Sequence, residues 1–254
     1  LELEAIGAFV ATQRAVVRGI VLTHAHWDHL LGPARFPGVP VIAHAGYAAV
    51  IAVHHDDLAR QVAAWQSAEG AECAGVFALP SPDVTFDDQI HIHLPRHSLT
   101  AFAAPGHAPD ALVLYEPVEG LLWAGDILSD VEVPMVMDTF RHYRTTLEQL
   151  ARLDVRVLVP GHGTATTDRA EICARVGNDR TYLESVEMCV ASAVGQGASL
   201  SETIVRCGDI DFVQPDAYPN AHRWNLEQAY IEAGGAASGI TGWAQDWLVE
   251  ETGC

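Results

Sequence analysis

A cluster of four metal-ligating side chains directly after a short apolar segment constrains this chain more than any other feature. The run Gly-Ile-Val-Leu-Thr at residues 19–23 is typical of a buried strand, and His24, His26, Asp28 and His29 follow it at once. A loop at the end of a strand can direct two histidines toward one cation and the next two ligands toward a second. Because so dense a pattern seldom arises by chance in a histidine-rich surface loop, it predicts a metal site.

Three later apolar segments also end in a loop that carries a histidine or an aspartate. They are residues 99–104, 120–124 and 155–159, and the polar residues that follow them are His107, Asp126 and His162. Mixed α/β enzymes place ligands at the edge of a rigid sheet in this way. We therefore expect these three residues to join the first cluster in space.

The remaining periodicity predicts a mixed α/β chain in two parts. Helical spacing is present over residues 1–17, 45–65 and 143–153, and strand patterns occupy residues 39–43, 89–94 and 111–115. Beyond Thr166 the pattern is helical. Capping boxes are formed by Asp168 with Glu171 and by Ser199 with Glu202, and helices are expected to stop at Gly208 and Gly234. We predict a core over residues 1–166 and a helical appendage over residues 167–254.

The order of these motifs resembles the metallo-β-lactamase superfamily, whose signature is H-x-H-x-D-H followed by a separate His, an Asp and a final His. The later elements are present here as Pro105-Gly106-His107, Gly125-Asp126 and Pro160-Gly161-His162-Gly163. The resemblance covers about residues 19–166 and implies an αββα sandwich. That family normally has two or more strands ahead of the helix that leads into the first motif. None precedes Leu1, so either the sequence begins late or the fold is incomplete.

The resemblance also implies a two-metal centre. In the family, one ion is held by the residues that match His24, His26 and His107. The other ion is held by those that match Asp28, His29 and His162, and the residue that matches Asp126 bridges the two ions. Zn²⁺ is the expected ion, with iron or manganese as alternatives. Two such ions about 3.5–4 Å apart can lower the pKa of a shared water toward about 7 and so supply a hydroxide nucleophile. Asp28 and Asp126 are the expected catalytic residues.

The branch of the family is less sharply defined. A bridging aspartate resembles the glyoxalase II-like, lactonase and phosphodiesterase branches more than true β-lactamases. Lactonases usually carry a tyrosine where Ser129 stands, and the appendage has few basic residues for glutathione. We predict hydrolysis of a small ester, thioester or lactone. The alternatives are a β-lactam hydrolase, a mononuclear-iron oxidoreductase like the persulfide dioxygenases, and an inactive binding module.

Charge and cysteine content restrict the partners and the compartment. Acidic residues outnumber basic ones 33 to 14, and the formal charge of −19 argues against a nucleic acid or an anionic membrane as partner. No apolar run is long enough for a membrane span. The 5 cysteines form no C-x-x-C pair, and their odd number favours a reducing compartment, so we expect a cytoplasmic protein. The oligomeric state is left open.

The appendage is the expected source of substrate contacts. We predict that residues 167–235 cover the metal site as a lid, with Tyr182 and His222 contacting a small acyl substrate. Two other histidine pairs, at residues 54–55 and at 91 and 93, fit an exposed helix or strand face better than a ligand set. The cysteines are expected to be buried or inert, since none falls on a family metal position.

Overall fold

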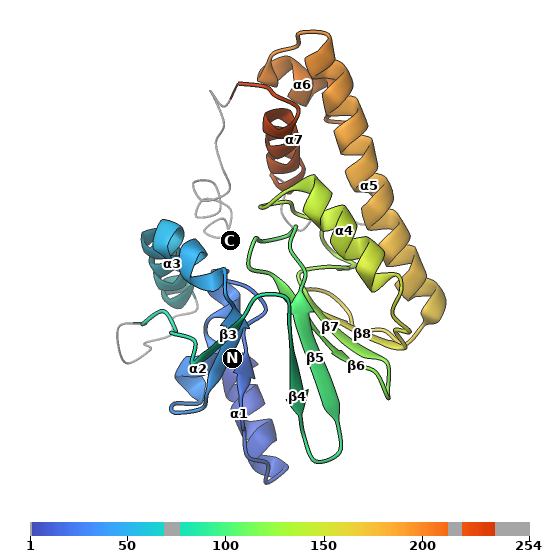
Figure 1. Ribbon diagram of the computed structural model, residues 1–254. Helices are drawn as coiled ribbons and strands as arrows, with labels where there is room; N and C mark the ends of the chain where they lie inside the picture. The colour runs from blue at the N-terminus through green and yellow to red at the C-terminus, as the bar shows by residue number, and fades with distance from the viewer. Residues whose placement is uncertain (1, 69–76, 213–219, 237–254) are drawn as a thin grey trace.

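Two β-sheets packed face to face between helices form the core of the protein (Figure 1). The computed structural model describes residues 2–68, 77–212 and 220–236. The first sheet is parallel, in the order β1-β2-β3, and contains β1 (Ile20–Val21), β2 (Val41–His44) and β3 (Val84–Phe86). The second sheet runs in sequence order and contains β4 (Gln89–His93), β5 (Ser98–Ala103), β6 (Leu112–Glu116), β7 (Leu121–Gly125) and β8 (Val157–Pro160). Its pairs are antiparallel except β7 and β8, which are parallel.

Helices flank the two sheets (Figure 1). They are α1 (Glu2–Thr12), the 3₁₀ turn η1 (Trp27–His29), α2 (Gly32–Arg35), α3 (Tyr47–Ala68), α4 (Phe140–Leu150), α5 (Arg169–Gly195), α6 (Leu200–Cys207) and α7 (Ala221–Glu232). Figure 1 shows α1, α2 and α3 on the side of the first sheet and α4 to α7 on the side of the second. Within the described ranges, none of these helices combines the length and the apolar character that crossing a membrane requires.

Helix α4 illustrates how the sequence specifies these layers. Its buried residues recur at helical spacing along one face, and they are Phe140, Tyr143, Thr146, Leu147 and Leu150. The Thr139 side chain caps the helix by accepting a hydrogen bond from the His142 amide at 3.1 Å. The apolar face therefore packs on the second sheet, and the cap sets where the helix begins.

Three groups of buried side chains fill the spaces between the layers. Phe86, Ala101 and Leu112 lie between the two sheets. A second group joins the first sheet to α3, and a third joins β7 and β8 to α4, α5 and α7. The layers are thus α, β, β and α, the arrangement expected from the sequence.

The expected C-terminal helices are also present. α6 begins with the predicted capping box of Ser199 and Glu202 and ends at Gly208. α5 and α7 share the third buried group with the sheet, so the core extends beyond residue 166. The boundary between residues 166 and 167 stays a prediction, and residues 237–254 of the appendage lie outside the described ranges.

A disulfide that the cysteine spacing did not predict joins two of these helices. Cys189 on α5 and Cys207 at the end of α6 are bonded, with their Cα atoms 6.0 Å apart. Cys173 is a free, exposed thiol. Because disulfides are typical of oxidising compartments, this bond does not support the reducing environment that the odd cysteine count favoured.

Candidate metal centre

The predicted ligands all lie where strands end, along the edge where the loops of the two sheets meet. His24 and His26 follow β1, and η1 then carries Asp28 and His29. His107, Asp126 and His162 follow β5, β7 and β8 in turn. The Leu112 amide donates a hydrogen bond to the Thr23 carbonyl at 2.8 Å, which joins the two sheets next to His24.

Two glycines allow the loops to approach each other this closely. Gly106 has a φ of +136°, and a Cβ there would collide with the backbone of Tyr143. At Gly161 a Cβ would collide with the Asp126 carboxylate, and the Gly161 amide donates to the Gly125 carbonyl at 2.7 Å. The His162 loop therefore lies directly against the loop that carries Asp126.

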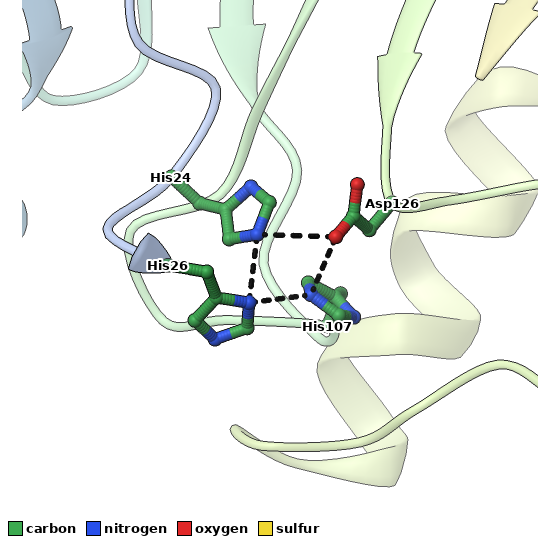
Figure 2. A group of neighbouring side chains, drawn as sticks. All are labelled: His24, His26, His107 and Asp126. Atoms are coloured by element: carbon green, nitrogen blue, oxygen red, sulfur yellow. Dashed lines mark hydrogen bonds and ion pairs between the residues drawn. The ribbon is translucent and has the colours of Figure 1, made fainter. Parts of the chain in front are cut away.

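The first ligand group consists of His24, His26, His107 and Asp126 (Figure 2). His26 Nδ1 lies 2.8 Å from His24 Nε2 and 3.1 Å from His107 Nε2. Asp126 Oδ2 lies 3.4 Å from His24 Nε2 and 3.6 Å from His107 Nε2. Ligand atoms about 2.0–2.1 Å from one ion at tetrahedral angles lie about 3.3 Å apart, so these separations fit a zinc-sized cation.

The second group consists of Asp28, His29, His162 and again Asp126. Asp28 Oδ2 lies 3.2 Å from His29 Nε2 and 3.0 Å from His162 Nε2. Asp126 reaches His29 Nε2 through Oδ1 at 3.1 Å and His162 Nε2 through Oδ2 at 3.4 Å. The structure thus brings all seven predicted ligands together, and Asp126 is common to both groups.

Two of the three buried histidines of the first group, His26 and His107, are suited to bind a cation rather than a proton. Burial, together with His24 and His107, lowers the pKa of His26 well below 6.5. Burial and the neighbouring His24 likewise lower the pKa of His107 to about 3, despite the opposing effect of Asp126. Both rings are therefore neutral at physiological pH, and their lone pairs face a common point.

In the second group, the two carboxylates raise the pKa of the histidines instead of leaving it lowered. Burial alone would lower the pKa of His29, but Asp126 and Asp28 outweigh it and raise that pKa to about 10. The same two carboxylates raise the pKa of His162 to about 11 against the effect of burial. A proton held on each of these rings marks a place where a divalent cation would supply the positive charge instead. The donor set therefore fits two ions.

Neighbouring groups orient the histidine rings. The Thr23 hydroxyl lies 3.1 Å from Nδ1 of His24 and 3.2 Å from Nδ1 of His29, which leaves both Nε2 atoms facing Asp126. Such contacts to the second ring nitrogen fix which nitrogen binds the metal.

A cavity beside His107 and Asp126 contains residues that the sequence analysis did not assign to the site. The other residues that line it are Leu128, Ser129, Glu132, Val133, Pro134, Met135, Tyr143 and Asp179. The Tyr143 hydroxyl is buried and has no hydrogen-bond partner among the described residues. Asp179 is 2% exposed and comes from α5, so the helical appendage contributes to the wall of this cavity.

The predicted substrate residues Tyr182 and His222 are not among those that line this cavity. Tyr182 is buried, and its hydroxyl lies 2.8 Å from His222 Nδ1 and accepts a hydrogen bond from Asn225 at 2.9 Å. His222 Nε2 lies 3.0 Å from the Cys207 carbonyl oxygen. The two residues therefore contact each other within the packed helices, and their role in substrate binding stays a prediction.

Of the four histidines expected on an exposed helix or strand face, three are exposed and His54 is half-buried. His91 and His93 are exposed on β4 and contact Thr100 and Ser98 of the neighbouring strand. His55 is exposed on α3 beside Asp56. None of them belongs to the two ligand groups found among the described residues.

Comparison with solved structures shows the same fold in several proteins. A stereoselective inverting sec-alkylsulfatase from Pseudomonas sp. is similar with a TM-score of 0.75 at 15% identity, over 93% of this chain and 44% of that one. A metallo-β-lactamase family protein from Thermus thermophilus has a TM-score of 0.64 at 19% identity, over 91% and 81% of the two chains. A metallo-β-lactamase from Pontibacter korlensis has a TM-score of 0.51 at 21% identity, over 69% and 76%. The chain spans less than half the length of the alkylsulfatase.

The family profile of the metallo-β-lactamase superfamily matches residues 4–162, a range that contains all seven ligand residues. Members of this superfamily are generally metal-dependent hydrolases. With the αββα layers, the strand-end loops and the complete ligand set, this match shows that the chain belongs to the metallo-β-lactamase superfamily.

Proposed function

We propose that the protein is a two-metal hydrolase of a small ester, thioester or lactone. The observation that supports this most is the sharing of Asp126 between two complete ligand groups. Such an arrangement suits two cations held close together, which is the geometry of two-metal hydrolytic sites. Zn²⁺ is the ion we expect from the mixture of neutral imidazoles and carboxylates.

Divalent ions in these groups would supply Lewis acidity, which polarises an ester carbonyl and makes water more acidic. The side chains supply the rest of the chemistry. Asp28 uses Oδ2 toward His29 and His162, while its Oδ1 is buried without a hydrogen-bond partner among the described residues. Oδ1 is therefore available to accept a hydrogen bond from an attacking water, so Asp28 can orient that water.

Tyr143 is the second residue that we assign to the reaction. Its hydroxyl is buried at the cavity beside His107 and Asp126 and makes no hydrogen bond to a described residue. Burial, with the charges of Asp179 and Asp126, raises its pKa well above 10, so the hydroxyl keeps its proton. We expect it to donate a hydrogen bond to an oxygen of the substrate, where negative charge develops during hydrolysis.

A sulfate ester is the second candidate substrate. The likeness to the sec-alkylsulfatase covers 93% of this chain and so includes the helices beyond residue 162, where the family profile ends. An acyl substrate and a sulfate ester would be hydrolysed at the same metal centre, and the two reactions differ in the bond that is cleaved. A small, neutral or singly charged substrate, rather than RNA or DNA, agrees with the net charge of −19.

The test uses protein freed of metal with a chelator and reloaded with zinc, iron or manganese. Its substrate panel holds an aryl ester, short and long lactones, a glutathione thioester, a secondary alkyl sulfate, a β-lactam and a phosphodiester. We expect turnover of an acyl or sulfate ester that is lost in Asp126→Asn, falls about 100- to 1,000-fold in Tyr143→Phe, and is unchanged in the exposed control His91→Ala. A metal-loaded protein that turns over none of these esters would contradict the proposal.

A further inference from the structure

The side chain of Arg175 lies between two of the loops that carry metal ligands. It comes from α5, outside the range that the family profile matches, and only 5% of it is exposed. Its Nη1 donates to the Leu128 carbonyl at 3.1 Å, and its Nη2 donates to the Thr164 carbonyl at 3.0 Å. One guanidinium group thus binds the main chain two residues after Asp126 and two residues after His162.

The loop after Asp126 needs such support, because its backbone is strained. Leu128 has a φ of +61°, a conformation that residues with a side chain seldom adopt unless their surroundings impose it. Both of its main-chain polar groups are held by α5. The carbonyl accepts from Arg175, and the amide donates to the buried carboxyl of Asp179.

The two loops are also tied to each other at this point. Asp130 Oδ1 accepts a hydrogen bond from the Thr164 amide at 2.7 Å, and its Oδ2 lies 3.3 Å from Arg175 Nη2. Glu171, one turn before Arg175 on α5, accepts from Nε at 3.2 Å. The buried positive charge is therefore compensated by two carboxylates, and the rigid guanidinium fork is free to span the two carbonyls.

We propose that Arg175 is a positioning residue for the metal centre, which holds the loops of Asp126 and His162 at the separation that two ions require. The appendage then contributes to metal binding through α5, whichever substrate the centre acts on. This inference rests on the proposed two-metal site. It goes further because it proposes that α5, a helix that carries no metal ligand, determines the position of Asp126, the ligand that both groups share.

The test measures metal binding, so it needs no substrate. Metal-free protein is titrated with Co²⁺, and the visible absorption spectrum and the dissociation constants are recorded for the parent and for Arg175→Met, Arg175→Lys and Arg180→Met. The last is a matched control, because Arg180 lies on the same helix and is exposed beside Glu184. Outer contacts of this kind typically change metal affinity about 10- to 100-fold.

We expect Arg175→Met to lose affinity by about that factor and to change the cobalt spectrum, while Arg180→Met matches the parent. The Co²⁺ affinity of Arg175→Lys should lie between that of the parent and that of Arg175→Met, since one ammonium group cannot reproduce the guanidinium fork that spans both carbonyls. A purely stabilising role would lower the melting temperature and leave the spectrum unchanged. A folded Arg175→Met with the parent's affinity and spectrum would overturn the proposal.

A second variant keeps the test decisive if Arg175→Met does not fold. Asp130→Ala removes the acceptor of the Thr164 amide and one partner of Arg175, at a side chain that is 21% exposed. We expect a smaller loss of Co²⁺ affinity in the same direction, and parent-like binding would overturn the inference. A parent that binds no Co²⁺ would overturn the proposed function and this inference together, whereas two bound ions with equal affinity in both variants would overturn the positioning role alone.

Discussion

Nδ1 of His107 lies 3.2 Å from the main-chain oxygen of Met135, to which it donates a hydrogen bond. This bond places the lone pair of His107 on Nε2, which faces His26. The backbone on both sides of Met135 is held by one residue of α7. Asn225 accepts from the Val136 amide at 2.8 Å and donates to the Pro134 carbonyl at 2.9 Å.

Substitution of Asn225 by leucine should therefore affect stability and metal binding together. Asn225→Leu leaves the buried Val136 amide and Pro134 carbonyl without partners, and we expect the free energy of unfolding to fall by about 1–3 kcal/mol or more. Metal affinity should fall about 10-fold, because the Met135 carbonyl that orients His107 is released. Urea unfolding and a metal titration measure the two effects.

Tyr182→Phe is the matched control for this substitution. It removes a hydroxyl that Asn225 contacts but leaves the two bonds of Asn225 to residues 134 and 136. We expect its metal affinity to equal that of the parent. A parent-like metal affinity in Asn225→Leu would show instead that the orientation of His107 does not depend on α7.

The predicted substrate lid is tested by Tyr182→Ala and His222→Ala. If these residues shape the substrate pocket, both variants should change the preference for acyl chain length by at least a fewfold while the metal content stays intact. The kinetic comparison uses short and long lactones and a glutathione thioester. An unchanged chain-length preference together with reduced thermal stability would assign both residues to packing alone.

Asp179 should make stability depend on pH. Burial raises its pKa from 3.8 to about 8, even though the Leu128 amide and Arg175 oppose the shift. Between about pH 4 and 8 the folded state therefore holds one proton more than the unfolded state, so the contribution of this group falls as pH rises through that window.

Asp179→Asn removes that dependence and keeps an acceptor for the Leu128 amide. We expect the melting temperature of metal-free Asp179→Asn, relative to the parent, to rise by several degrees between about pH 5 and pH 9. Thermal unfolding of both proteins in a chelator measures the difference. A difference that stays constant with pH would contradict a protonated Asp179 in the folded protein.

Gly161→Ala should disturb the ligand that both groups share. A Cβ at residue 161 would collide with Asp126 Oδ1 and would lie 3.1 Å from His29 Cε1. We expect weaker metal binding, by about 10-fold or more. The control is Gly177→Ala on α5, where a Cβ meets no atom within 4 Å and an alanine favours the helix by up to about 1 kcal/mol. Equal metal affinity in the two variants would contradict the close packing of the Gly161 loop on Asp126.

Much of the fold could be predicted from the sequence because its elements carry local patterns. The segment at residues 89–94 alternates polar and apolar residues, the segment at residues 99–104 is largely apolar, and the structure pairs β4 with β5 there. Strand β3 was not predicted, since Val84–Phe86 has only three residues, too few for a distinctive strand pattern. Its place beside β2 follows from tertiary packing. The same holds for the disulfide of Cys189 and Cys207, which depends on how α6 packs on α5.

The metal ligands could be predicted because several of them lie close together in the sequence. The residues that support these ligands could not be predicted. His24 to His29 are adjacent in sequence, so their pattern is visible without a structure. Arg175 and Asp179 are four residues apart on a helix, a spacing typical of an exposed ion pair. Only the packing of α5 against the ligand loops buries both of them and turns them toward Leu128. Tyr143 likewise fits an amphipathic helix, and its free hydroxyl depends on what surrounds it.

The metal stoichiometry of the protein and of Asp126→Ala tests the central claim most directly. Calorimetric titration of the metal-free protein with Zn²⁺ should show about two bound ions for the parent, because the seven ligands form two groups. Asp126→Ala should lose tight binding of both, because Asp126 belongs to each group. A parent that binds no Zn²⁺, or an Asp126→Ala variant that still binds two ions with the parent's affinity, would contradict the account.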